Sequence, residues 1–372
     1  MSQFIPVNEP VLDGNERKYL NQCIDSGWIS SEGPFVEEFE KRFAARVGRK
    51  HGIAVCNGSA ALEAAAAALG IGQGQQVLMP TFTIISCASA ITRLNALPRL
   101  VDCDPETWNM DVSSIEARLT PDTKAIMVVH IYGLPVDMDP VLEIAKRHSL
   151  TIIEDAAEMI GQTYRGRPCG SFGDISTFSF YPNKHVTTGE GGMIVTDDDA
   201  IAERCRSLRN LAFTPPRRFV HHELGWNFRM TNLQAAVGLA QLERLDEFVA
   251  RKRHIFARYM DLLADVNGIQ LPRARTDYAE NISWVFGVVL DDDIPFDAVE
   301  AMSRLSQLGV GSRPFFWPMH EQPVFRAMGL FSAESHPVAE RIARRGLYLP
   351  SGLALTDNQM TRVAAAVRQI LS

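Results

Sequence analysis

Two residues near the middle of the chain, Asp155 and Lys184, are of types that could do covalent chemistry together. Asp155 ends a short apolar run, residues 152–155, whose β-branched residues predict a buried parallel strand. Lys184 follows Pro182-Asn183, which end a second predicted strand at 175–181 and place the lysine on a loop. Open α/β sheets bind their ligands at the carboxyl ends of such strands. We therefore expect the carboxylate and the amine to face each other across a ligand.

Pyridoxal phosphate is a ligand that needs such a pair. A lysine amine holds its aldehyde as a Schiff base, and a carboxylate keeps its pyridine nitrogen protonated so that the ring can accept carbanion electrons. The lysine must also lose its proton, and a ring cation with apolar neighbours lowers the pKa of the amine. Taken alone, a loop lysine is usually a solvated surface group, and an aspartate at a strand end usually caps the next helix. The order of the surrounding motifs decides between these interpretations.

These motifs resemble a known family. Residues 154–158 (Glu-Asp-Ala-Ala-Glu), 178–180 (Phe-Ser-Phe) and 183–193, which include Thr-Thr-Gly-Glu-Gly-Gly-Met, are similar to the fold-type-I sugar-nucleotide aminotransferases, the DegT/DnrJ/StrS family. The resemblance covers nearly the whole chain. It implies an α/β fold of the aspartate aminotransferase type, with a mostly parallel seven-stranded sheet between helices in a large domain. It places this domain, with an N-terminal arm, at residues 1–245 and a smaller C-terminal α/β domain at 246–372, and it implies pyridoxal 5′-phosphate as the cofactor.

The resemblance also implies an activity, the transfer of an amino group from glutamate to a nucleotide-linked 4-keto-6-deoxy sugar. Within the family, the residues of these motifs are most similar to those of enzymes that convert GDP-4-keto-6-deoxy-D-mannose to GDP-perosamine for O-antigen and lipopolysaccharide biosynthesis. A 4-aminotransferase acting on a dTDP- or UDP-linked 4-keto-6-deoxyhexose is an alternative. So is a sugar 3-dehydratase, in which histidine replaces the lysine. His185 follows Lys184, but the motifs on both sides align with the family without a gap, which favours the aminotransferase.

The turn after the first predicted strand is a candidate phosphate site. Residues 52–56 predict a strand, and Asn-Gly-Ser at 57–59 begins an alanine-rich helix. Free backbone amides and the dipole at such a helix start favour a phosphate, although Asn-Gly-Ser is also ordinary capping chemistry. The resemblance implies that the phosphate is bound by the turn residues Gly58, Ser59 and Ala60 and by Ser179 on the later strand.

Three further residues are connected with the cofactor by the resemblance. Ile84 stands where relatives carry an aromatic residue stacked on the pyridine ring, and an isoleucine can pack there only through dispersion contacts. Glu158 is expected near the cofactor's phenolic oxygen. Asn227 lies in a motif that resembles the family's dimer loop, in which the asparagine reaches the cofactor phosphate of the other subunit. The resemblance therefore implies a homodimer with shared active sites.

Substrate-binding candidates lie outside these motifs. Trp28 and Ser30 resemble the family's N-terminal arm beside the substrate pocket, although a buried tryptophan that anchors a loop fits as well. Arg217 and Arg218, on a loop stiffened by prolines, could bind a diphosphate in bidentate fashion or form a solvated basic turn. An aromatic-rich segment at 313–320 suits a nucleotide sugar but could instead pack the small domain. The remaining candidates are Arg229, Arg313, Phe315 and His320.

The composition fits a large soluble enzyme. With 372 residues, 46% of them hydrophobic and 22% charged, the chain suits a large domain plus a smaller one. The formal net charge of −7 argues against a nucleic-acid partner, which needs a basic surface. The six cysteines have no metal-type spacing, so no metal site is predicted. Because neither a signal-like start nor a membrane-spanning run is found, we expect a cytoplasmic protein without a membrane partner.

The elements that must position these residues alternate along the chain. Further strands are predicted at 77–80, 97–101, 125–130 and 191–196, and the intervening helices imply parallel strands with right-handed crossovers. Pro98 restricts its strand to an edge or a strand start. A nicotinamide-binding fold would need GxGxxG after the first strand, and residues 57–61 lack it. A long helical pattern from 231 to about 263 contains the predicted domain change near 245.

Overall fold

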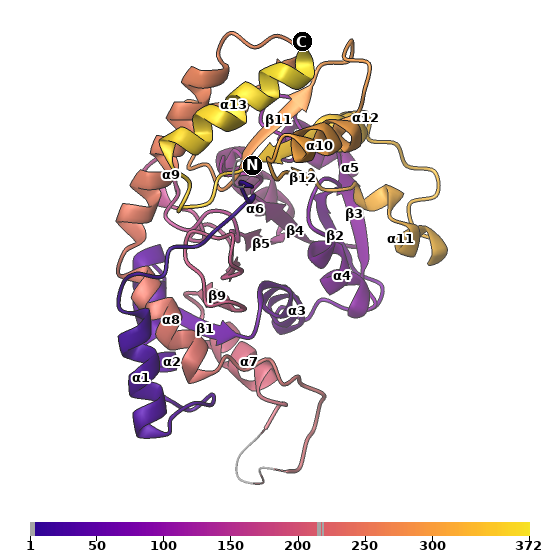
Figure 1. The fold of residues 1–372 in the computed structure, drawn as a ribbon. Helices are drawn as coiled ribbons and strands as arrows, with labels where there is room; N and C mark the ends of the chain where they lie inside the picture. Colours follow the sequence, from indigo (N-terminus) through magenta and orange to yellow (C-terminus); the bar gives the residue numbers. More distant parts are fainter. Residues whose placement is uncertain (1–3, 214–216, 218) are drawn as a thin grey trace.

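The computed structural model describes residues 4–213, 217 and 219–372 and has an α/β architecture (Figure 1). Among these residues, seven strands form the central sheet, which confirms the predicted fold class. In spatial order the strands are β1 (His51–Val55), β9 (Gly192–Thr196), β8 (Ile175–Ser179), β5 (Thr151–Asp155), β4 (Thr123–Val129), β2 (Gln76–Pro80) and β3 (Leu97–Val101).

The direction of the strands is mostly as predicted. Strands β3, β2, β4, β5 and β8 pair in parallel, so their carboxyl ends lie at one edge of the sheet. The exception is β9, which runs antiparallel to both β8 and β1, because the chain turns back directly after the lysine loop. Strand β3 lies at the edge of the sheet, where Pro98 removes no interior hydrogen bond.

Helices cover both faces of the sheet, and side chains of the strands alternate between the two cores. In β1, for example, Ile53 and Val55 face the core under α3 and α4, whereas Ala54 faces the core that α2, α6 and α8 cover. The helices of this part are α1 (Glu16–Ser26), α2 (Pro34–Val47), α3 (Gly58–Ala68), α4 (Ile85–Arg93), α5 (Ile115–Arg118), α6 (Met138–His148), α7 (Asp199–Arg209) and α8 (Asn232–Leu242).

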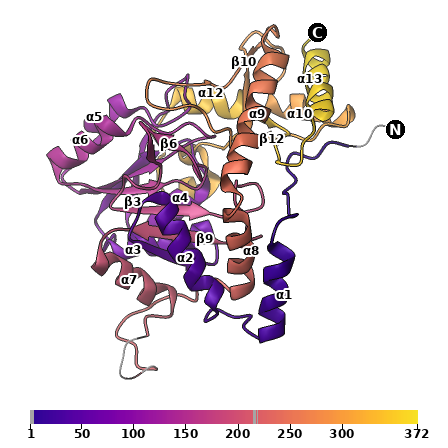
Figure 2. The same cartoon turned by 90° about the vertical axis from the view of Figure 1, so that its left-hand side faces the viewer.

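The long helical pattern after Thr231 is two helices rather than one. Helix α8 ends at Leu242, and α9 (Leu245–Leu263) begins after a break at Glu243-Arg244. The two helices follow each other along one side of the molecule and lead from the central sheet to a second layer (Figure 2). The break lies beside the domain boundary that the sequence predicts near residue 245, and this boundary stays a prediction.

The second layer is a small antiparallel sheet with its own hydrophobic core. Its strands are β10 (Ile269–Gln270), β11 (Phe286–Leu290), β13 (Gly346–Leu349) and β12 (Arg313–Pro314). The helices of the C-terminal part are α10 (Ala298–Gln307), α11 (Pro323–Ala327), α12 (Pro337–Arg345) and α13 (Asp357–Leu371). Helices α10 and α13 pack in this core, whereas α11 and α12 pack against a core of the central sheet. The N-terminal Ile5 is completely buried in this layer, where its backbone bonds Gly309 and Gly311. The N-terminal segment therefore packs with the C-terminal elements.

None of the helices in the described part of the chain has the length and hydropathy that a bilayer crossing requires.

Candidate active site

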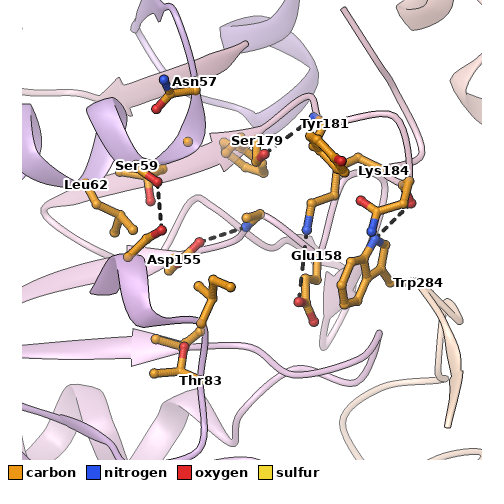
Figure 3. Close-up of a pocket in the computed structure, with 18 of the residues that line it drawn as sticks. Asn57, Ser59, Leu62, Thr83, Asp155, Glu158, Ser179, Tyr181, Lys184 and Trp284 are labelled. Atoms are coloured by element: carbon orange, nitrogen blue, oxygen red, sulfur yellow. Dashed lines mark hydrogen bonds and ion pairs between the residues drawn. The ribbon is translucent and has the colours of Figure 1, made fainter. Parts of the chain in front are cut away.

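A cavity of about 550 Å³ opens at the carboxyl ends of the parallel strands. Its walls come from the ends of β4, β5 and β8, the starts of α3 and α4, and the lysine loop (Figure 3). The C-terminal layer closes it with three aromatic side chains, Trp284, Phe316 and Tyr348. Asp155 and Lys184 both line this cavity.

Asp155 is the last residue of β5, and its carboxylate is buried. Its Oδ1 accepts a hydrogen bond from the backbone amide of Ala157 over 3.0 Å, and its Oδ2 accepts one from the thiol of Cys87 over 3.3 Å. Burial raises the pKa of Asp155, while these hydrogen bonds and the charge of Lys184 act in the opposite direction. The carboxylate is thus held by donors from two elements.

Lys184 extends from the loop after β8 into the cavity (Figure 3). The loop is closed by a turn in which its backbone amide donates to the carbonyl of Tyr181 over 2.9 Å. The amine lies 3.9 Å from the centre of the Trp284 ring and 4.0 Å from Oε1 of Glu158. Burial lowers the pKa of the Lys184 amine, and the carboxylates of Glu158 and Asp155 oppose this shift. An amine in this setting loses its proton more readily than a surface lysine.

Glu158 stands beside the lysine with its side chain buried. Its Oε2 accepts a hydrogen bond of 2.6 Å from the backbone amide of Tyr132. Burial raises the pKa of Glu158 to about 8, although the charge of Lys184 and the Tyr132 bond pull it down. At neutral pH, Glu158 and Lys184 therefore form a pair in which the carboxyl group can hold the proton.

The start of α3 forms the opposite end of the cavity. Asn57 caps the helix, because its Oδ1 accepts from the backbone amide of Ala60 over 2.8 Å. This bond uses the Ala60 amide and leaves those of Gly58 and Ser59, which have no helical acceptor, for an anion. A Cβ at Gly58 would lie 2.8 Å from the Cβ of Ser179, so glycine allows α3 to approach β8. The Ala60 amide is thus occupied by the cap, and a phosphate contact through Gly58 and Ser59 stays a prediction.

The residues that line the cavity fit pyridoxal phosphate. Thr177 Oγ1 and Asn183 Oδ1 are buried, line the cavity and have no hydrogen-bond partner within the described residues. Unpartnered buried polar atoms at a cavity wall are what a polar ligand would satisfy. Ile84 lies on the wall at the start of α4 and is 43% exposed, so one face of a bound ring could pack against it. The helix start, the carboxylate and the lysine provide complementary groups for the phosphate, the ring nitrogen and the aldehyde.

Several predicted residues lie outside the cavity of the single chain. Trp28 and Ser30 are exposed, and their carbonyls accept hydrogen bonds of 2.6 and 2.7 Å from Asn232. Arg229 donates to Asn210 over 2.6 Å, and the backbone of Asn227 bridges to the same residue. Arg217 is exposed, and Arg218 lies outside the described residues.

In the aromatic-rich segment, two predicted residues, Phe315 and His320, do not line the cavity. Phe315 is buried with its ring centre 4.7 Å from that of Tyr132, so it packs the core and does not line the cavity. His320 is buried and uses both ring nitrogens, one with Thr81 at 2.8 Å and one with Glu340 at 2.9 Å. Phe316, which the sequence analysis did not single out, lines the cavity instead.

Arg313 is exposed in β12, opposite Tyr348 of β13, whose side chain lines the cavity.

His130 is buried between Glu154, at 3.1 Å from its Nε2, and the backbone amide of Val136, which donates to its Nδ1 over 3.0 Å. Both ring nitrogens of His130 are therefore satisfied within the protein.

Trp284 is the main residue that the sequence analysis missed. Its indole Nε1 donates to the carbonyl of Asn183 over 2.9 Å, and its ring faces the amine of Lys184. The residue lies two positions before β11 in a run of apolar residues, and nothing in that pattern separates a cavity residue from a core residue. The preference of a buried indole N–H for a hydrogen-bond partner is the signal that could have been used.

Comparisons with known proteins agree with this fold and site. Residues 10–368 match the profile of the DegT/DnrJ/EryC1/StrS aminotransferase family. The chain is 46% identical to the GDP-perosamine synthase of Caulobacter vibrioides, over 99% of this chain and 98% of that protein. It is 40% identical to the GDP-perosamine synthase of Escherichia coli O157:H7, over 100% and 99% of the two chains. The crystal structure of the aminotransferase TlmJ from Streptoalloteichus hindustanus is similar with a TM-score of 0.91 at 30% identity, covering 99% and 98%.

The chain therefore belongs to the DegT/DnrJ/EryC1/StrS aminotransferase family. Its fold is that of the sugar aminotransferases, as the sequence motifs predict.

Proposed function

We propose that this aminotransferase uses pyridoxal phosphate and glutamate to convert GDP-4-keto-6-deoxy-D-mannose to GDP-perosamine, for O-antigen or a related polysaccharide. The amine of Lys184 and the carboxylate of Asp155 in one cavity carry the proposal for the cofactor. Three proteins named GDP-perosamine synthase, 39–46% identical over nearly the full chain, support the sugar nucleotide. The dTDP- and UDP-linked sugars remain the alternative substrates.

Each group of the cofactor has a proposed partner in the chain. When bound, pyridoxal phosphate supplies an electron-accepting ring that stabilises the charge left on a carbon that loses a proton. Asp155 would hold the ring nitrogen, and the amides of Gly58 and Ser59 with the hydroxyl of Ser179 would hold the phosphate. Lys184 would tether the aldehyde and, once free, move a proton between carbon atoms. The lowered pKa of its amine suits this role as a base.

The aromatic wall is the proposed seat of the sugar. Trp284, Phe316, Tyr348 and Tyr181 all line the cavity, as Lys184 does. Sugar rings present apolar faces that pack on aromatic side chains. Arg313, opposite Tyr348 in the neighbouring strand, is an exposed cation and suits a diphosphate.

We propose that the active enzyme is a homodimer with shared sites. Asn227, Arg229 and Trp28 lie outside the cavity of their own chain, so they would serve the site of a second copy. Large hydrophobic side chains around them are exposed, among them Leu224 at 91% and Phe219 at 81%, and exposed groups of this kind mark interaction surfaces.

All six cysteines are free thiols, which supports a cytoplasmic location.

Two measurements test this proposal. Borohydride trapping of the purified holoenzyme, followed by peptide mass spectrometry, should place the cofactor on Lys184, and Lys184→Ala should abolish trapping. An adduct on another lysine would contradict the proposed site. When the enzyme is incubated with glutamate and one of the GDP-, dTDP- or UDP-linked 4-keto-6-deoxyhexoses, we expect the highest rate of amination with the GDP-linked mannose derivative. Preference for another nucleotide would contradict the proposed substrate and leave the proposed cofactor chemistry intact.

A further inference from the structure

Lys252, in the first half of α9, is a lysine that the proposed chemistry does not use. It is 1% exposed, and its amine donates to the backbone carbonyls of Trp284 and Ser351, both over 2.7 Å. No carboxylate within the described residues forms an ion pair with it. A lysine buried without a counter-charge is costly, so its position calls for a compensating function.

The two carbonyls match the amine in its neutral form. Burial, together with the charge of Lys184, lowers the pKa of Lys252 to about 7. A neutral amine has two N–H donors, which equals the number of acceptors that it has in the structure, so both bonds survive the loss of a proton. Lys184 and His185 are the titratable groups of the described chain that face it. Burial, with Lys252 nearby, lowers the pKa of His185 to about 3, which keeps that ring neutral.

The first of these carbonyls belongs to the tryptophan that faces the cofactor lysine. Trp284 is held at its backbone by Lys252 and at its indole N–H by the carbonyl of Asn183, the residue before Lys184. Its ring then lies 3.9 Å from the amine of Lys184. The second carbonyl, of Ser351, follows β13, which carries Tyr348 into the same cavity. A single amine thus ties α9 to two segments of the aromatic wall.

We propose that Lys252 is a positioning residue, which holds the backbone of Trp284 so that the indole covers the amine of Lys184. The inference rests on the proposed role of Lys184 but concerns the protein without its cofactor. Removing the Lys252 amine would free the Trp284 carbonyl, release the indole and let water reach Lys184. Because burial is what lowers the pKa of the Lys184 amine, water at this position makes the amine harder to deprotonate.

The test is the reactivity of Lys184 in the apoenzyme as a function of pH. Labelling with a trace of an amine-acylating reagent, read by peptide mass spectrometry, gives the pH at which half of the Lys184 amine reacts. For Lys252→Met, which keeps the length of the side chain but has no donor, we expect this midpoint to rise by about one pH unit. Below the midpoint, this corresponds to roughly tenfold less reactive amine.

Tyr259→Phe is the matched control. Tyr259 is also buried on α9, and its hydroxyl donates to the carbonyl of Pro350 over 2.8 Å, next to Ser351, and not to the carbonyl of Trp284. This variant loses a buried hydrogen bond of the same kind, and its Lys184 midpoint should stay at the wild-type value. A folded Lys252→Met with an unshifted midpoint would overturn the proposal, and so would an equal shift in both variants.

If Lys252→Met does not fold, Trp284→Phe decides the matter. It removes the indole while leaving Lys252 in place, and the proposal requires the Lys184 midpoint to move from the wild-type value, because the ring both excludes water from the amine and makes a cation–π contact with it. An unchanged midpoint would show that the indole does not control the amine, and the proposal would fall. Borohydride trapping of the wild-type holoenzyme separates this outcome from a failure of the proposed function, because trapping depends on the cofactor and the labelling profile does not.

Discussion

The thiol of Cys87, on α4, donates a hydrogen bond to Oδ2 of Asp155 over 3.3 Å, so a cysteine supports the carboxylate proposed to hold the cofactor ring. Both residues are buried, and Thr83 Oγ1 lies 3.3 Å from the same sulfur. Burial raises the pKa of the Cys87 thiol well above its usual range, which keeps it protonated and donating. A thiol is a weak donor, so most of the carboxylate charge remains available to a ligand.

Cys87→Ala should weaken cofactor binding. The loss of one hydrogen bond to the carboxylate costs about 1 kcal/mol, or roughly a fivefold increase in the dissociation constant of pyridoxal phosphate. Equilibrium dialysis of the apoenzyme measures this constant. Cys205→Ala is the control, because Cys205 is equally buried on α7 but forms no hydrogen bond with Asp155. Equal affinities for wild type and Cys87→Ala would show that the thiol has no part in binding.

Glu158→Gln should change how the stability of the apoenzyme depends on pH. The pKa of Glu158 is raised from 4.5 to about 8, so the folded protein holds a proton that the unfolded chain releases between these values. Its contribution to stability is therefore present below about pH 4.5 and is lost as pH rises toward 8. Glutamine cannot ionise, so the Tm of the variant minus that of wild type should increase from pH 5 to pH 8. In free energy of unfolding, the variant should gain on the order of 2 kcal/mol relative to wild type over this pH range. A Tm difference that does not vary with pH would contradict the raised pKa of Glu158.

Gly58→Ala should damage the proposed phosphate site. Its Cβ would lie 2.8 Å from that of Ser179, so α3 must move away from β8. We expect a loss of about 1–3 kcal/mol in stability and, because the amides at the helix start move, weaker cofactor binding. Thermal unfolding and equilibrium dialysis report the two effects. Gly72→Ala is the control, since its Cβ would meet nothing closer than 3.9 Å, and it should behave as wild type.

Subunit mixing tests the shared site. Lys184→Ala and Asn227→Ala should each be inactive alone, because each lacks one half of every site. After the two are unfolded and refolded together, half of the dimers should contain one intact site, which gives about a quarter of wild-type activity. A mixture as inactive as its components would argue that Asn227 serves its own chain. Wild type refolded under the same conditions controls for recovery.

Residues within short motifs could be predicted, and those that depend on distant packing could not. Asp155 and Lys184 were found because each closes a local strand pattern. Trp284 comes from the C-terminal half and reaches the lysine only through the packing of two layers. In the irregular segment that contains Phe315 and Phe316, no periodicity indicates which ring points inward. The break between α8 and α9 falls at Glu243-Arg244. Neither residue is a glycine or proline, so the sequence contains no helix-breaking residue from which this break could be predicted.

The seat of Ile5 has a consequence for biosynthesis and for dissection of the chain. Ile5 donates to the carbonyl of Gly309 over 2.9 Å and accepts from the amide of Gly311 over 2.8 Å. These residues leave the ribosome long after Ile5, so the first-made segment must wait, undocked, until most of the polypeptide has been synthesised. A fragment of residues 246–372 would lack the Ile5 side chain that fills part of its core. We expect this fragment to be insoluble unless a peptide that contains Ile5 is supplied.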